Sequence, residues 1–147
     1  MRNDKPGCEN APKKVGDKSY MQFITTCVMK NWIVLEPIGD CDRYDCVIDR
    51  GNGFERVQVK TGRLKKGSVV FPACSSHYHT KHGQITDTFK RSYEGQVELF
   101  GVYCFETGKC YVVPLKDLSV KSAVSLRVDS TKNNQDKRIR WACEYEL

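Results

Sequence analysis

The fold of this chain is decided by Tyr44-Asp45-Cys46-Val47-Ile48-Asp49, the turn Arg50-Gly51-Asn52-Gly53, and Phe54-Glu55-Arg56-Val57-Gln58-Val59-Lys60. Both outer segments are short and rich in β-branched residues, which is typical of strands. Glycines between them supply the positive backbone angles that a tight hairpin needs. The stretch therefore predicts two antiparallel strands, at residues 44–49 and 54–60.

The second strand carries polar side chains in a pattern with a period of two. Gln58 and Lys60 then lie on one face of the strand, and Val57 and Val59 lie on the other. Hairpin pairing would bring Asp45 close to Gln58 and Lys60. Carboxylate and carbonyl oxygens are the ligands that Mg²⁺ prefers, and a nearby lysine can orient water or neutralise charge on a phosphate. This pattern is typical of a metal-dependent nuclease.

Further short motifs follow the same order along the chain as in a known family. They are Pro37-Ile38-Gly39-Asp40, Arg43-Tyr44-Asp45, Val57-Gln58-Val59-Lys60-Thr61, Tyr93-Glu94-Gly95, Tyr103-Cys104, Tyr111-Val112-Val113-Pro114, Lys132-Asn133-Asn134-Gln135 and Ile139-Arg140-Trp141-Ala142. With these motifs the chain resembles the PD-(D/E)XK nucleases, and within them the group I intron-encoded homing endonucleases that carry Gln at the third catalytic position. The resemblance covers most of the chain.

The resemblance implies an α/β fold with a restriction-endonuclease-like core. Its mixed central sheet would be flanked by helices, and a loop that contacts DNA would protrude from it. The implied activity is hydrolysis of both strands of double-stranded DNA at a long recognition site. The implied cofactor is Mg²⁺, for which Mn²⁺ can substitute.

The resemblance also assigns roles to individual residues. Asp45 and the backbone carbonyl of Val59 would bind the metal, Gln58 would stand where Asp or Glu is usual, and Lys60 would be the motif lysine. Relatives carry a glutamate in the first helix, but here Tyr20 stands at that position. Asp17 lies one helical turn earlier on a similar face, so it is a further candidate metal ligand.

Two alternatives to a homing endonuclease remain open at this stage. A Holliday-junction resolvase shares the nuclease fold but recognises branched DNA by its shape. A catalytically inactive DNA-binding protein derived from a nuclease would account for the loss of the glutamate at Tyr20.

Length and charge fit a small nucleic-acid enzyme. The 147 residues are expected to form a single nuclease domain, residues 1–147. The net charge of +6 favours a polyanionic partner, because basic side chains gain affinity by releasing counterions from phosphates. A specific DNA interface buries roughly 1,000–2,500 Å² of protein, so we expect a homodimer or homotetramer on a roughly palindromic site.

The cellular location is predicted from what the sequence lacks. The N-terminus has no apolar segment of signal-peptide type, and no run of apolar residues reaches the length needed to cross a membrane. A cytoplasmic location is therefore expected, with no membrane partner. The eight cysteines are then expected to be reduced thiols.

The remaining elements are expected as follows. Residues 1–15 are a flexible arm whose Lys14 touches phosphate, residues 17–30 are an amphipathic helix, and residues 61–66 are a basic turn that places Arg63 beside the cut site. Short strands are expected at residues 33–35, 69–71 and 126–128, a buried hairpin at 97–103 and 110–113, and a short helix or turn at 115–120.

Residues 75–93 form a long polar segment that we expect to be a loop or ribbon entering a DNA groove. Its candidate DNA contacts are Ser75, Ser76, His77 and Arg91. A second interpretation is a structural zinc site, with ligands from the set Cys74, His77, His79 and His82, although a polar loop near DNA is favoured.

Overall fold

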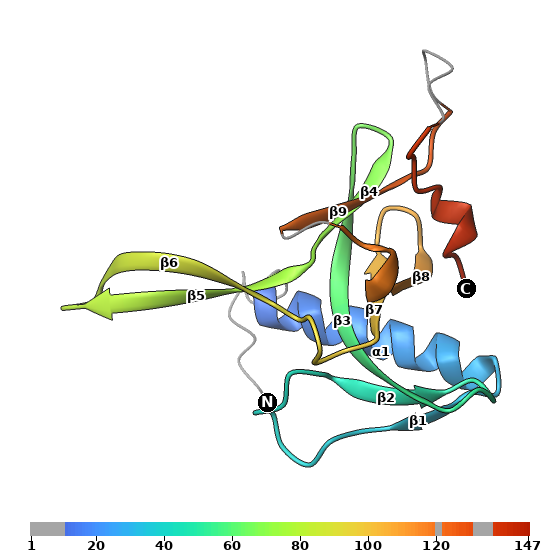
Figure 1. Ribbon diagram of the computed structural model, residues 1–147, viewed down its shortest axis with the longest axis horizontal. Helices are drawn as coiled ribbons and strands as arrows, with labels where there is room; N and C mark the ends of the chain where they lie inside the picture. The colour runs from blue at the N-terminus through green and yellow to red at the C-terminus, as the bar shows by residue number, and fades with distance from the viewer. Residues whose placement is uncertain (1–10, 120–121, 131–136) are drawn as a thin grey trace, which may run out of the picture.

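The computed structural model describes residues 11–119, 122–130 and 137–147 (Figure 1). Within these ranges lie one α-helix, α1 (Pro12–Met29), and two short 3-10 helices, η1 (Leu115–Asp117) and η2 (Ala142–Glu144). The strands are β1 (Ile33–Leu35), β2 (Cys46–Asp49), β3 (Phe54–Lys65), β4 (Ser68–Pro72), β5 (Cys74–Lys81), β6 (Gln84–Ser92), β7 (Leu99–Cys104), β8 (Lys109–Pro114) and β9 (Ala123–Arg127). None of the described helices is long and apolar enough to cross a membrane.

The long strand β3 organises the main sheet. Its first part pairs antiparallel with β2, its middle part pairs parallel with β7, and its last part pairs antiparallel with β4. The strands β1, β8 and β9 extend the sheet from β2, β7 and β4 respectively. The sheet is therefore mixed, as predicted, and the hairpin expected between residues 44–49 and 54–60 is confirmed.

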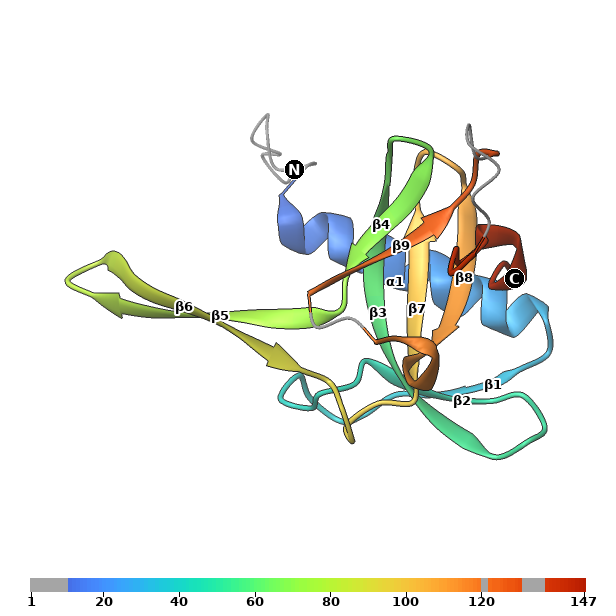
Figure 2. The same cartoon turned by 45° about the horizontal axis from the view of Figure 1, so that its top comes forward.

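The helix α1 packs across one face of β3, β7 and β8 (Figure 2). Its buried stripe of Ser19, Phe23 and Cys27 repeats every four residues, which is the spacing of one helix face. Phe23 lies directly over Gly101 of β7, where an added Cβ would come within 2.6 Å of the Phe23 ring. Gly101 therefore sets how closely the helix approaches the sheet.

The opposite face of β7 and β8 packs against β4 and β9. Phe100 and Val102 of β7 lie in this second core with Tyr111 of β8, Phe71 of β4 and Leu126 of β9. Because both faces of β7 and β8 are buried, these strands read as apolar runs and not as an alternating pattern. The predicted buried hairpin is thus confirmed.

Three predictions were wrong in detail. The helix begins at Pro12, because proline is well tolerated in the first turn, so the expected arm can concern only residues 1–10, which lie outside the described residues. The expected basic turn at 61–66 is strand up to Lys65, and the chain reverses at Lys66 and Gly67, which both have positive φ. A single α-helix, and not several, covers the sheet in the described ranges.

Strands β5 and β6 form a separate two-stranded ribbon that projects away from the core (Figures 1 and 2). Its tip reverses at His82 and Gly83, and both residues have the positive φ of a primed hairpin turn. Nearly all residues of β6 are exposed, so the ribbon has no core of its own. The protruding loop expected at residues 75–93 is this ribbon.

Candidate active site

The β2–β3 hairpin fixes Asp45 by short-range contacts. The backbone N–H of Asp45 donates to the carbonyl oxygen of Val57 at 2.8 Å, which places its side chain beside β3. Its Oδ2 accepts hydrogen bonds from Nε2 of Gln58 at 2.5 Å and from the backbone N–H of Val59 at 2.7 Å. The predicted proximity of Asp45 and Gln58 is therefore confirmed.

The Asp45 carboxyl group carries a charge in a half-buried position. Burial raises its pKa, and the Val59 N–H, the positive charge of Lys60 and the Gln58 amide act in the opposite direction. The net direction is upward, because desolvation of the carboxylate is the largest effect. An additional positive charge in this place would therefore stabilise the ionised form.

A cleft of about 480 Å³ opens in front of Asp45. Its lining includes five carboxylates: Asp17, Glu36, Asp40, Asp42 and Asp45. No described group donates a hydrogen bond to Oδ1 of Asp45, so this oxygen is available to a ligand in the cleft. Carboxylate oxygens are hard donors of the kind that Mg²⁺ takes, but no three of the described acids converge closely enough to form a metal-binding group by themselves.

Tyr20 projects from α1 into the same cleft. Its hydroxyl donates to Oε1 of Glu36 at 2.5 Å, and the backbone carbonyl of Asp45 lies 3.4 Å away. Burial, the hydrogen bond to Glu36 and the negative charges nearby raise the pKa of the phenol well above its usual range, so it stays neutral and acts as a donor. Tyr20, which the resemblance aligns with a glutamate of relatives, thus holds a glutamate that lies outside the helix.

Glu36, Asp40 and Asp42 line this cleft and were not predicted as site residues, and of these only Glu36 contacts Tyr20. Glu36 follows β1 directly, and the antiparallel register pairs Leu35 with Val47. Continuing this register by one residue sets Glu36 opposite the residue that directly follows Asp45. Pairing of residues 33–35 with 44–49 was the signal that could have placed it.

The two other candidates on α1 lie in its first turns. Asp17 lines the cleft and is exposed, so the structure brings this candidate metal ligand to the site. Lys14 is exposed one turn earlier and does not line the cleft.

The side chain of Lys60 lies on the same strand face as Gln58 but has different neighbours. Its Nζ donates to the Tyr93 hydroxyl at 2.8 Å and lies 4.7 Å from the centroid of the Tyr93 ring. Arg43 lies over the same ring, at 4.2 Å. Lys60 does not line the cleft itself, but its charge acts on Asp45.

The candidate DNA contacts separate into two groups. Ser75, Ser76, His77 and Arg91 all lie on the ribbon, in β5 and β6. Arg63 does not lie beside the cleft: it is on β3, where it approaches Glu106 at 4.0 Å and the Phe105 ring at 5.8 Å. This location follows from the continuation of β3 beyond residue 60.

The ribbon also separates the residues considered as zinc ligands. Cys74 is buried at the base, where its thiol donates to the carbonyl of Ser122, and His82 lies at the tip. His77 stacks on Phe89 and His79 lies tilted against the same ring, each with ring centroids 5.3 Å apart. Among the described residues, no three His, Cys, Asp or Glu side chains form a metal-binding group, and the seven cysteines there are free.

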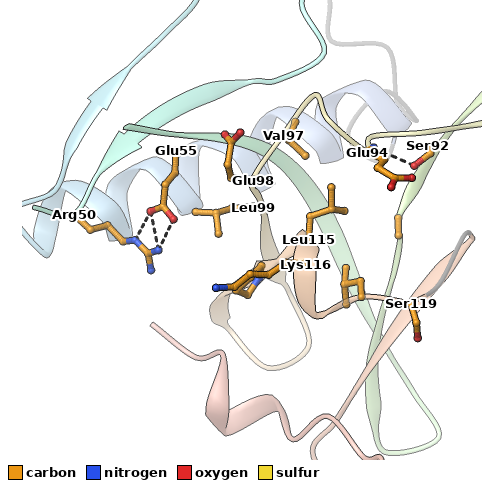
Figure 3. A pocket seen from close by; sticks show the side chains of 13 residues that line it. Arg50, Glu55, Ser92, Glu94, Val97, Glu98, Leu99, Leu115, Lys116 and Ser119 are labelled. Atoms are coloured by element: carbon orange, nitrogen blue, oxygen red, sulfur yellow. Dashed lines mark hydrogen bonds and ion pairs between the residues drawn. The ribbon is translucent and has the colours of Figure 1, made fainter. Parts of the chain in front are cut away.

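A second cavity, of about 690 Å³, has a different chemistry (Figure 3). Arg50 and Glu55 on its wall are joined by hydrogen bonds, and Glu98 forms an ion pair with Arg56. Its charges are therefore largely neutralised by neighbours. The Asp45 cleft differs from this cavity in that it brings a carboxylate oxygen without a hydrogen-bond donor together with further acids.

The chain is similar to known endonucleases. The PD-(D/E)XK endonuclease family matches residues 10–147. Among solved structures, the bacterial homing endonuclease I-Ssp6803I matches with a TM-score of 0.74 and 25% sequence identity, over 93% of this chain and 89% of that chain. No curated protein matches the sequence.

Proposed function

The chain belongs to the PD-(D/E)XK endonuclease family, and on that premise we propose that it is a site-specific homing endonuclease. It hydrolyses phosphodiester bonds of double-stranded DNA with the help of a divalent metal. One observation carries the proposal: Asp45 is fixed by Gln58 and Val59, at an open acidic cleft, and Lys60 follows on the same strand face.

The residues of the cleft that would hold the metal come from three elements. They are Asp45, the backbone carbonyl of Val59 and Glu36, with Asp17 as a further acid at the rim. A bound Mg²⁺ or Mn²⁺ supplies charge stabilisation at the scissile phosphate and lowers the pKa of a coordinated water. Without a cation, the five carboxylates would repel the phosphate backbone.

The side chains around the cleft have separate roles in the reaction. The Lys60 ammonium orients the attacking water and offsets negative charge that develops on the phosphate. Gln58 fixes the rotamer of Asp45 through its hydrogen bond to Oδ2. Tyr20 holds Glu36 against the cleft by donating its hydroxyl proton, and its raised pKa keeps that proton in place.

The ribbon supplies the DNA-binding surface. A two-stranded ribbon fits the major groove, and Lys81, Lys90 and Arg91 give this one exposed positive charge. Ser75, Ser76 and His77 lie near its base. We infer that two copies of the chain, in a homodimer or homotetramer, place two ribbons on a roughly palindromic site, and that hydrolysis leaves 5′-phosphate and 3′-hydroxyl ends.

The proposal is tested by incubating the protein with a randomised double-stranded DNA library and Mg²⁺, followed by sequencing of the cut ends. We expect one enriched site, which Lys60→Ala does not cut. Lys65→Ala is the matched control, because Lys65 is an exposed lysine of the same strand. Cleavage that is equal in all three proteins, or absent in all three with Mg²⁺ and Mn²⁺, contradicts the proposal.

A second function is favoured by Tyr20, which stands at the position expected for a glutamate. A nuclease-derived protein that only binds DNA would retain one site from the same library in a binding selection and cut nothing. In that case Asp45→Ala would leave its DNA binding unchanged. A four-way junction added as competitor separates both readings from a junction resolvase, which would prefer the junction to the duplex.

A further inference from the structure

The ammonium group of Lys60 is held by a side chain outside the cleft. Tyr93 accepts its hydrogen bond at 2.8 Å, and the ammonium lies 4.7 Å from the centroid of the same ring. The Tyr93 side chain is buried, with 4% exposure, and packs edge-on against Phe100 with ring centroids 5.6 Å apart. Because the ring is fixed in this way, it restricts the positions that the Lys60 ammonium group can occupy.

The same ring also contacts Arg43, and each of the three guanidinium nitrogens of Arg43 donates a hydrogen bond. Its Nε donates to Gln96 Oε1 at 2.7 Å, one terminal nitrogen donates to Ser75 Oγ at 2.8 Å, and the other donates to the Ser92 carbonyl at 2.9 Å. Ser75 and Ser92 belong to the two strands of the ribbon, at its base. Arg43 therefore links both ribbon strands to the ring that holds Lys60.

Arg43 also lies two residues before Asp45 in the sequence. If the base of the ribbon moves, Arg43 would therefore displace both the Tyr93 ring and the segment that leads to Asp45. A lysine at position 43 would keep the charge but could not reach three acceptors in different directions.

We propose that Tyr93 and Arg43 are positioning residues, which place Lys60 for catalysis and connect its position to the base of the DNA-binding ribbon. This inference rests on the proposed nuclease function for its catalytic meaning. The contacts themselves exist without DNA, so they can be tested without cleavage.

The decisive variant is Tyr93→Phe, which keeps the buried ring and removes only the hydroxyl. Its matched control is Tyr111→Phe, because Tyr111 is also buried and its hydroxyl bonds Thr107 at 3.2 Å, outside the site. The first readout is the rate at which an amine-acylating reagent modifies Lys60 in the DNA-free protein, measured by mass spectrometry. We expect a rate about tenfold higher in Tyr93→Phe, the size of a lost hydrogen bond to a charged group, and no change in the control.

The second readout is single-turnover cleavage of the enriched site. We expect Tyr93→Phe to cut about tenfold more slowly at saturating protein with an unchanged Kd for DNA, because the hydroxyl contacts Lys60 and not DNA. A Lys60 acylation rate equal to that of the unmodified sequence overturns the positioning role. If no protein cuts DNA, the proposed function fails, while the acylation result still decides this inference.

The link to the ribbon is tested with Arg43→Lys. We expect faster amide hydrogen exchange at residues 75 and 92, together with faster acylation of Lys60. Faster exchange in the ribbon with unchanged acylation of Lys60 overturns the connection between the ribbon and the lysine.

Discussion

The two ends of the candidate site are held in different ways. Asp45 is fixed by partners on its own hairpin, at most 14 residues away in the sequence. Lys60 is fixed by Tyr93, 33 residues away, and through it by the base of the ribbon. The acid end is therefore a local structure, whereas the lysine end depends on tertiary contacts.

This difference indicates which part of the site can change its position when DNA binds. The acid end is built into the hairpin, where burial raises the pKa of the Asp45 carboxyl group. The lysine end shares a ring with Arg43, which contacts both ribbon strands. Substitutions at the acid end should change metal dependence, and substitutions at the lysine end should change how binding leads to cleavage.

The largest effect is expected at the acid end, from Asp45→Asn. Loss of the metal-binding carboxylate should lower the single-turnover cleavage rate about 10³-fold, as for removal of a key electrostatic group. The melting temperature should not fall, because the neutral amide avoids the cost of a half-buried charge. Cleavage assays and thermal unfolding check both parts, and a variant that cuts normally would remove Asp45 from the site.

The next largest effect is expected at Glu36, and it distinguishes the role of Glu36 from that of the other acids of the cleft. Glu36→Gln should raise the Mg²⁺ concentration needed for half-maximal cleavage about 10- to 100-fold, since ligand-shell substitutions have effects of that size. Asp42→Asn is the control, because Asp42 lines the cleft without a contact to Tyr20. Equal Mg²⁺ dependence in the two variants would exclude a specific role for Glu36.

A variant of the core tests whether Gly101 sets how closely α1 approaches the sheet. Gly101→Ala places a Cβ within 2.6 Å of the Phe23 ring and should cost about 1–3 kcal/mol of unfolding free energy. Gly16→Ala, with no atom within 4 Å of the added Cβ, should stabilise α1 by about 0.5–1 kcal/mol. Denaturant titrations measure both changes; opposite signs are expected, and equal signs contradict the packing account.

The smallest effect is a pH dependence of stability without metal. Because the pKa of Asp45 is raised in the folded state, the folded protein binds the proton more tightly than the unfolded chain does. The contribution of Asp45 to stability should therefore fall as the pH rises from the pKa of an unfolded aspartate, about 3.9, through the folded-state value. Thermal unfolding across this window should show the trend in the unmodified protein and not in Asp45→Asn; identical pH profiles would contradict it.

The local part of the site could be predicted from the sequence. A period-two pattern with glycines in the turn is sufficient to bring Asp45 and Gln58 together and to put Lys60 on the same strand face as Gln58, because hairpin pairing involves neighbours in the chain. The ribbon was also predictable as a protruding segment, because a long polar stretch cannot form a core.

The non-local part could not be predicted from the sequence in the same way. Glu36 reaches the cleft only through the pairing of β1 with β2, and Tyr93 reaches Lys60 only because the ribbon returns to the sheet. Arg63 was misplaced because β3 continues to Lys65, and no residue within β3 has the positive φ of a turn. Tertiary pairing decides these positions.

The central claim is that the Asp45 cleft binds a divalent metal, and Tb³⁺ luminescence tests it most directly. Tb³⁺ prefers oxygen ligands, as Ca²⁺ does, and Tyr20 and Tyr44 line the cleft, where they can sensitise its emission. We expect saturable emission that Mg²⁺ or Mn²⁺ displaces, that Asp45→Asn abolishes, and that Asp87→Asn on the exposed ribbon leaves unchanged. Emission of equal strength in the unmodified protein and in Asp45→Asn would contradict the account.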